Sequence, residues 1–87
     1  MQSKQNILAK QVHTTDINYI MDAGWYWIDP GVVSNTPGSY WGALEVINSG
    51  AVTQRFTTYP NNYTISRIYA NSGWTDWRYP NGEIFAP

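Results

Sequence analysis

The 87-residue sequence contains no cysteine, so no disulfide can stabilise a chain whose small size limits the share of its surface that folding buries. It contains one histidine, His13, and six scattered acids, which give no ligand cluster at the spacings of zinc or calcium sites. We therefore expect no metal and no other cofactor. Oligomerisation is the stabilising device that remains.

Charge and long apolar runs are also scarce. Only 13% of the residues are charged and five are basic, which leaves no cluster of Lys and Arg for binding nucleic acid. No apolar run approaches the length of about 18 residues that a membrane span needs, and no charged-then-apolar leader begins the chain. We expect a protein that is soluble when made, without a signal peptide, and that neither binds nucleic acid nor inserts into a membrane.

Aromatic residues are abundant by contrast, with five Trp, seven Tyr and two Phe. They cluster only after residues 1–13, a polar segment that holds both lysines and that we interpret as a connector. Residues 14–87 then form one domain. Its first segment begins with a capping cluster, Thr14-Thr15-Asp16, and ends at Gly24. The apolar residues between them, Ile17, Ile20 and Met21, have helical spacing, so we expect a helix of about two turns there.

From Gly24 onward, strand-forming residues alternate with turn residues. A short aromatic strand, Trp25–Ile28, precedes a loop with Pro37-Gly38. Four segments follow, separated by Asn-Ser-Gly, Tyr-Pro-Asn-Asn and Asn-Ser-Gly turns: "WGALEVI", "AVTQRFTT", "YTISRIYA" and "WTDWRY". The pattern predicts a mainly β (α+β) fold, in which the short N-terminal helix leads into an antiparallel meander of four to five strands.

Loop lengths also predict the strand register. Loops of three, four and three residues pair Val46 with Val52, Phe56 with Ile65, and Tyr69 with Thr75. One face of the sheet is then mainly apolar, and it carries Leu44, Val46, Val52, Gln54, Phe56, Tyr63, Ile65, Arg67, Tyr69, Thr75, Trp77 and Tyr79. The other face is polar, and it carries Ala43, Glu45, Thr53, Arg55, Thr57, Thr64, Ser66, Ile68, Trp74, Asp76 and Arg78.

This register places a row of Gln54, Arg67 and Trp77 across three strands of the apolar face. A guanidinium can stack on an indole, and the glutamine amide can accept one of its hydrogen bonds. Such a row more often fixes packing than binds a ligand. Trp74, three residues before Trp77, is expected on the opposite, polar face.

Several ordered segments resemble one known family. They are "DINYIMDAGWYW", the loop with Asn35 and Pro37, "WGALEV", "QRF", "ISRIY" and "NSGWTDW", which together run from about Asp16 to Trp77. They are similar to the pyocin-knob domain found in phage tail fibres and in the fibre proteins of phage-tail-like bacteriocins. The matching positions include Gln54, Arg67 and Trp77, as well as Gly24, Leu44 and Glu45.

The resemblance implies a small, mainly antiparallel domain of a trimeric virion tail fibre, near the end that meets the host. Such a fibre is made in the bacterial cytoplasm and acts outside the cell. The residues themselves also favour an oligomer. Trp25, Tyr26 and Trp27 alternate between the two faces of a strand, so burying all three suggests a homotrimer with one of these faces at the subunit boundary.

Catalysis finds little support in the residues. A glycoside hydrolase needs two carboxylates that flank a cleft, and Glu45 and Asp76 are expected too far apart, in solvent. His13, the only candidate base for a serine nucleophile, lies in the connector. We expect no enzymatic activity.

Glycan binding is better supported, because a sugar packs its CH face on an aromatic ring and bonds its hydroxyls to planar polar groups. The candidate residues lie on the polar face and in loops: Trp74, Asp76, Arg78, Tyr40, Trp41, Tyr59, Asn61 and Asn62. The exposed aromatics would serve equally to pack against a neighbouring subunit. We therefore expect a tail-fibre knob domain that contributes to attachment to a bacterial surface glycan. The alternatives are a purely structural trimerisation or connector module of a fibre, and a carbohydrate-binding module appended to an enzyme.

Overall fold

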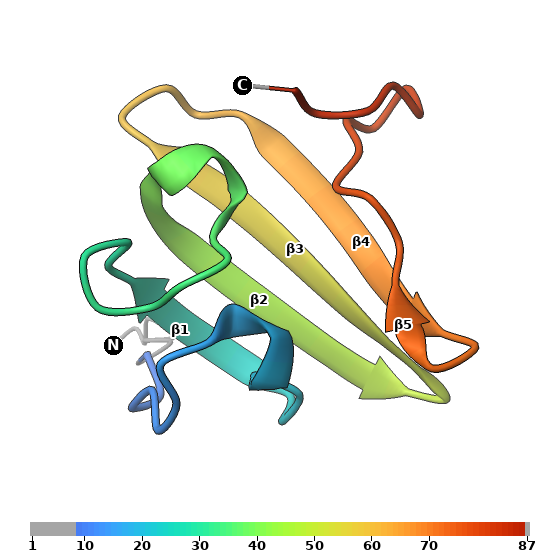
Figure 1. The fold of residues 1–87 in the computed structure, drawn as a ribbon, viewed down its shortest axis with the longest axis horizontal. Coiled ribbons are helices and arrows are strands. Elements are labelled where there is room, and N and C mark those ends of the chain that lie inside the picture. The colour runs from blue at the N-terminus through green and yellow to red at the C-terminus, as the bar shows by residue number, and fades with distance from the viewer. Residues whose placement is uncertain (1–8, 87) are drawn as a thin grey trace, which may run out of the picture.

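A computed structural model describes residues 9–86 and contains one five-stranded antiparallel sheet in the order β1-β2-β3-β4-β5 (Figure 1). The strands are β1 Gly24–Ile28, β2 Trp41–Ser49, β3 Ala51–Tyr59, β4 Thr64–Ala70 and β5 Gly73–Trp74. Each strand pairs with the one before it in sequence. The prediction of a mainly β meander is confirmed.

The predicted N-terminal helix is wrong. Between Thr14 and Gly24 the chain forms only η1, a 3-10 turn at Ile17–Tyr19; a second turn, η2, spans Pro37–Ser39. The capping signal itself is real, because the Asp16 side chain accepts a hydrogen bond from Asn18 N–H at 2.9 Å. The turn ends at Ile20, which is extended (φ −87°, ψ 93°) and buried with Ile17 in the core. Core packing has therefore overridden a weak helical preference.

The register of the central strands keeps the predicted faces. Phe56 faces Ile65 as expected, whereas Val46 faces Gln54 instead of Val52. The β2–β3 hairpin has Gly50 at its tip, with φ +102°, so it turns later than predicted. The resulting shift of two residues is even, and side chains alternate with a period of two, so the same residues remain on the apolar face.

The last hairpin differs by one residue, which corrects the placement of Trp74. Asn71 and Ser72 both have positive φ, 54° and 67°, and form a two-residue turn, so Tyr69 faces Trp74 instead of Thr75. Trp74 therefore lies on the apolar face, not on the polar one. Farther along, Ser66 pairs with Arg78, so one extra residue lies between Trp74 and Arg78, as in a bulge.

That extra residue restores the predicted register, and Trp77 remains on the apolar face as expected. Both tryptophans therefore lie on one face of the sheet, although regular strand geometry would separate them.

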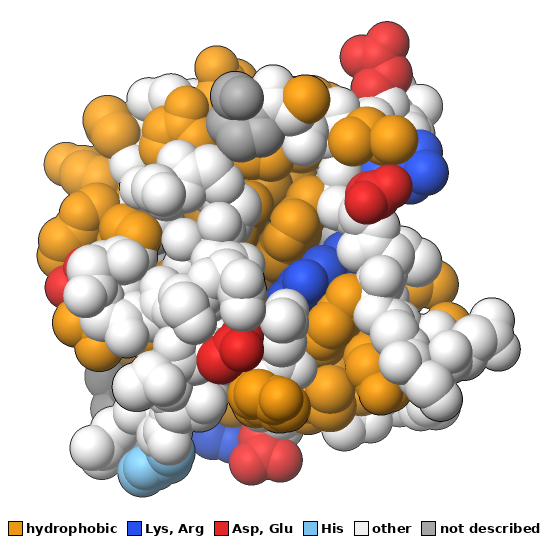
Figure 2. All heavy atoms as spheres, viewed as in Figure 1, with side chains coloured by type: hydrophobic (Ala, Val, Ile, Leu, Met, Phe, Trp, Pro, Cys, Tyr) orange, Lys and Arg blue, Asp and Glu red, His pale blue; other side chains and the backbone are white. Residues whose placement is uncertain are grey.

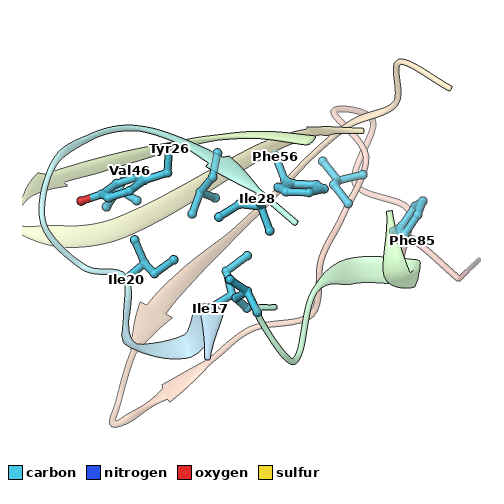
Figure 3. Close-up of a cluster of buried hydrophobic side chains, with 10 residues drawn as sticks. Ile17, Ile20, Tyr26, Ile28, Val46, Phe56 and Phe85 are labelled. Carbon is cyan, nitrogen blue, oxygen red and sulfur yellow. The ribbon is translucent and has the colours of Figure 1, made fainter. Parts of the chain in front are cut away.

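Within residues 9–86, the chain covers one face of the sheet, which we call the inner face. The segments containing η1 and η2 cross it in Figure 1, and Figure 3 shows the buried side chains between these segments and the strands. The core consists of Ile17, Ile20, Tyr26, Ile28, Val33, Leu44, Val46, Phe56, Ile65 and Phe85. On the opposite, outer face every strand residue is exposed or half-buried.

The chain joins the sheet before the expected domain boundary. The Lys10 N–H donates a hydrogen bond to Trp25 O at 2.6 Å, next to a parallel bridge between Lys10 and Tyr26. Residues 1–8 of the expected connector 1–13, and Pro87 of the expected domain 14–87, lie outside the described residues.

Candidate functional site

A pocket of about 500 Å³ opens on the inner side of the sheet, between the η1 segment and the chain that follows β5. We call it the polar pocket. Its lining residues are Asn18, Asn35, Arg67, Trp74, Thr75, Asp76, Trp77, Ile84 and Phe85. Figure 2 shows the hollow, with a basic side chain inside it.

The C-terminal segment, residues 75–86, forms one wall of this pocket by folding back on itself. Phe85 N–H donates to Trp77 O at 2.8 Å, and Tyr79 N–H donates to Glu83 O at 2.8 Å. Arg78 pairs with Ile84 in an antiparallel bridge. This chain reversal places Ile84 beside Arg78 and Phe85 beside Trp77.

Arg67 lies between the two tryptophans of the pocket. Its guanidinium carbon is 4.1 Å from the ring centroid of Trp74 and 4.6 Å from that of Trp77. The Trp74 ring contacts Tyr69, which comes two residues after Arg67 in β4. The Trp77 ring contacts Phe56, which faces Ile65, two residues before Arg67. Two rings thus hold the guanidinium by cation–π contacts.

Hydrogen bonds from the N–H groups at its edge hold the same guanidinium in place. Arg67 Nε donates to Gln54 Oε1 and Arg67 Nη2 donates to Asn18 Oδ1, each at 2.9 Å. Gln54 is fully buried, and its Nε2 donates to the carbonyls of Ile17 (2.8 Å) and Ile20 (3.0 Å). The row of Gln54, Arg67 and Trp77 is present on the inner face, and it ties η1 to the sheet.

The electrostatic setting of Arg67 is unusual for an arginine. Its side chain is buried, and desolvation lowers the pKa of Arg67 to about 10, although the negative charge of Asp16 acts in the opposite direction. The guanidinium is charged at neutral pH, and its burial opposes folding there. Because the folded pKa lies below the ordinary value, this penalty is relieved only as the pH rises above about 10.

The candidate residues from the sequence do not form one site. Trp74 and Asp76 line the polar pocket. Arg78 is exposed and its Nη1 donates to Gly82 O at 2.8 Å. Near the β3–β4 loop, Tyr40 packs against the core and its hydroxyl accepts a hydrogen bond from Asn61 Nδ2 at 3.1 Å. The neighbouring Asn62 is exposed in the loop, with φ +60°.

The two remaining candidates lie on the outer face. Trp41 and Tyr59 face each other across β2 and β3, and Trp27 of β1 has its ring centroid 6.2 Å from each of theirs. We call these three residues the outer aromatic corner; Trp27, Trp41 and Tyr59 are 47%, 44% and 61% exposed. A shallow hollow of about 290 Å³ adjoins it, lined by Ala9, Trp25, Tyr26, Trp27 and Ala43.

Several pocket residues were missed by the sequence reasoning. Asn18 lies in η1 and Asn35 in the loop before η2, and Asp16 joins them because its Oδ1 accepts from Asn18 N–H (2.9 Å) and Asn35 Nδ2 (3.0 Å). Ile84 and Phe85 arrive with the folded-back C-terminal segment. Asp16 with an asparagine two positions later was a readable local signal of a turn, but nothing local in the sequence brings these residues to Arg67.

Glu45 and Asp76, the two acids considered for catalysis, lie in different parts of the molecule. Glu45 pairs with Arg55 on the outer face at 2.9 Å, whereas Asp76 lines the polar pocket. Within residues 9–86, no three His, Cys, Asp or Glu side chains are grouped so that they could hold a metal ion. In the same part of the chain, no helix has the length and apolar character needed to cross a membrane.

Comparisons with known proteins add no assignment. No family model matches this chain, and neither the curated proteins nor the solved structures that were searched give a match.

Proposed function

We propose that this chain is a non-enzymatic attachment domain of a phage or phage-tail-like fibre, and that it binds a bacterial surface saccharide in the polar pocket. The fibre context rests on the resemblance of its motifs to the pyocin-knob domain. The binding part rests on one observation, the pocket of about 500 Å³ that combines two indole rings with amide, carboxylate and guanidinium groups. Attachment is then a matter of non-covalent recognition alone.

The pocket has the size and the chemistry that a sugar needs. Small-molecule sites usually have volumes of about 300–1,000 Å³ and combine apolar walls with a few convergent polar groups. Trp77, Ile84 and Phe85 offer apolar surface for the CH face of a sugar ring. Asn35 and Asp76 offer amide and carboxylate groups for its hydroxyls.

Nuclear magnetic resonance of the indole N–H groups can test this proposal. The chain would be titrated with oligosaccharides released from the surface polysaccharides of a panel of bacteria. Binding in the polar pocket shifts the indole signals of Trp74 and Trp77 and leaves those of Trp27 and Trp41 in place. If no oligosaccharide shifts any indole signal, the binding proposal fails; shifts confined to Trp27 and Trp41 would move the site to the outer aromatic corner.

A matched pair of variants sharpens the same test. Ile84 is 52% exposed at the polar pocket and Ile68 is 42% exposed on the outer face, so replacing either by serine removes a similar amount of apolar surface. Ile84→Ser should weaken saccharide binding by about threefold to tenfold, which corresponds to roughly one buried methylene group or slightly more. Ile68→Ser should leave the affinity unchanged. Equal effects of the two changes would contradict binding in the pocket.

The outer aromatic corner favours a second candidate function, a structural module that assembles fibre subunits. Three large aromatic side chains exposed side by side suit a protein contact better than solvent. Under this proposal, sedimentation equilibrium at micromolar concentration detects a trimer, which Tyr59→Ser weakens. A stable monomer under these conditions would count against the structural role while leaving saccharide binding open.

A further inference from the structure

Arg67 carries hydrogen-bonding capacity that the protein does not use. A guanidinium has five N–H donors. Within residues 9–86, Arg67 uses only Nε, toward Gln54, and one N–H of Nη2, toward Asn18. The two donors of Nη1 and the second donor of Nη2 have no acceptor in the described part of the chain, although the residue is only 7% exposed.

The charge of Arg67 also lacks a direct partner. Both of its acceptors are neutral amides, and the ion pair found among the described residues joins Glu45 to Arg55 instead. Asp16 compensates part of the charge from a distance, but its Oδ1 is bonded to Asn18 N–H and to the Asn35 amide. A buried charge without a partner is costly, and the lowered pKa of Arg67 shows that this compensation is incomplete.

The surroundings of the guanidinium limit how a ligand can reach it. The ring centroids of Trp74 and Trp77 lie 4.1 Å and 4.6 Å from its central carbon, and Gln54 and Asn18 already accept hydrogen bonds from two of its N–H groups. The unused N–H groups are those of the terminal nitrogens, and Arg67 lines the polar pocket. A planar acceptor that enters the pocket can therefore meet two N–H groups side by side, which is the geometry in which carboxylates bind arginine.

We propose that the saccharide bound in the polar pocket is acidic, and that its carboxylate accepts two hydrogen bonds from the open edge of Arg67. This inference rests on the proposed function and names the substrate class of the same site. A carboxylate fits better than a phosphate group because Asp76 lines the pocket. The single negative charge of a carboxylate is repelled less by this acid than the charge of about −1.5 to −2 on a phosphate monoester.

The test compares matched sugars by the indole N–H signal of Trp74. The probes are glucuronate and galacturonate, each against its neutral parent sugar, with glucose 6-phosphate and sodium acetate as further arms. At least one acidic sugar should bind about tenfold more tightly than its parent, since a charge-assisted hydrogen bond is worth at least that step in affinity. Glucose 6-phosphate and acetate should both bind more weakly than that acidic sugar.

The outcomes separate this inference from the proposed function. Neutral sugars that bind as tightly as their acidic counterparts would overturn the inference and leave saccharide binding intact. Tightest binding by glucose 6-phosphate would assign the pocket to phosphorylated sugars, and acetate binding as tightly as glucuronate would reduce it to a simple anion site; both overturn the inference. Failure of every sugar, including the oligosaccharide panel, overturns the proposed function itself.

A variant of Asp76 tests the same inference without disturbing the fold. Replacing Arg67 removes an anchor of the inner face, whereas Asp76 is exposed and its carboxylate makes no hydrogen bond among the described residues. Asp76→Asn removes a negative charge from the pocket, so it should raise the ratio of glucuronate to glucose affinity by about twofold to fivefold at low salt. A ratio that stays constant or falls would contradict binding of an anion beside this residue.

Discussion

The two pairs of tryptophans that flank the sheet differ in what holds them. On the inner face, Trp74 and Trp77 enclose Arg67, and Trp74 Nε1 also donates to Asn18 O at 3.1 Å. On the outer face, Trp27 and Trp41 contact each other, and their indole nitrogens have no acceptor among the described residues. The inner pair is thus positioned by a polar network, whereas the outer pair is positioned mainly by contacts between rings.

The two arginines of neighbouring strands show the same contrast. Arg55 of β3 forms an ion pair with Glu45 in an exposed setting, where such pairs contribute little to stability. Arg67 of β4 is buried and is held by amides and indoles instead. The inner face therefore accepts an electrostatic cost that the outer face avoids. In the proposed function, this cost is the consequence of positioning a cation for recognition of the saccharide.

Removing the central amide of the inner network should give the largest change in stability. Gln54→Leu leaves the carbonyls of Ile17 and Ile20 and the Nε of Arg67 without their partner in a buried setting. Unsatisfied buried groups cost about 1–3 kcal/mol each before relaxation, so we expect a loss of about 3 kcal/mol in the free energy of unfolding. Urea denaturation measures this loss.

The outer face supplies the control for this change. Thr53 precedes Gln54 and points to the outer face, where it is half-buried. Thr53→Val should change the free energy of unfolding by no more than about 0.5 kcal/mol. If Gln54→Leu is equally mild, the network does not hold η1 to the sheet.

Packing at Gly42 gives the next largest expected effect. A Cβ at this position would lie 2.7 Å from the Phe56 ring and would also collide with the Thr57 carbonyl. Gly42→Ala should therefore destabilise the chain by about 2 kcal/mol, as overpacking of a core does. At Gly73 a Cβ would meet no atom within 4 Å, so Gly73→Ala should be neutral or slightly stabilising in thermal unfolding. Equal melting temperatures for the two variants would show that the inner face can relax around an added methyl group.

The residues of the inner face were largely predictable from the sequence. Side chains of a strand alternate between the two faces, so an error of two residues in the register leaves each residue on the same face. The β2–β3 hairpin turned later than expected, yet Leu44, Val46 and Phe56 stayed on the face that was assigned to them. The predicted helix failed for another reason. Asp16, one of the three residues of the predicted capping cluster, does cap a turn, but Ile17 and Ile20 gain more from burial in the core than from continuing a short helix.

The polar pocket was less predictable for two reasons. It depends on a one-residue difference in the register of the β4–β5 hairpin, and it depends on the C-terminal segment folding back on itself. Asn71 and Ser72 adopt positive φ themselves, so Gly73 is not needed in the turn and Trp74 moves to the inner face. Neighbouring residues alone do not reveal the extra residue that then returns Trp77 to the same face. Asn18, Asn35 and Ile84 reach the pocket along segments outside the strands, and the whole fold sets the paths of these segments.

The smallest expected effect belongs to the outer arginine. Arg55→Gln breaks the exposed pair with Glu45 and should change the free energy of unfolding by less than about 1 kcal/mol, with a smaller difference at high salt. The same replacement at Arg67 removes both cation–π contacts and changes the partners of Gln54 and Asn18, so it should cost about 2 kcal/mol or more. Denaturation curves of the two variants at low and high salt compare the faces directly. A cost at Arg55 that equals the cost at Arg67 would mean that burial does not distinguish the two arginines, and that the inner network contributes no more than a surface ion pair.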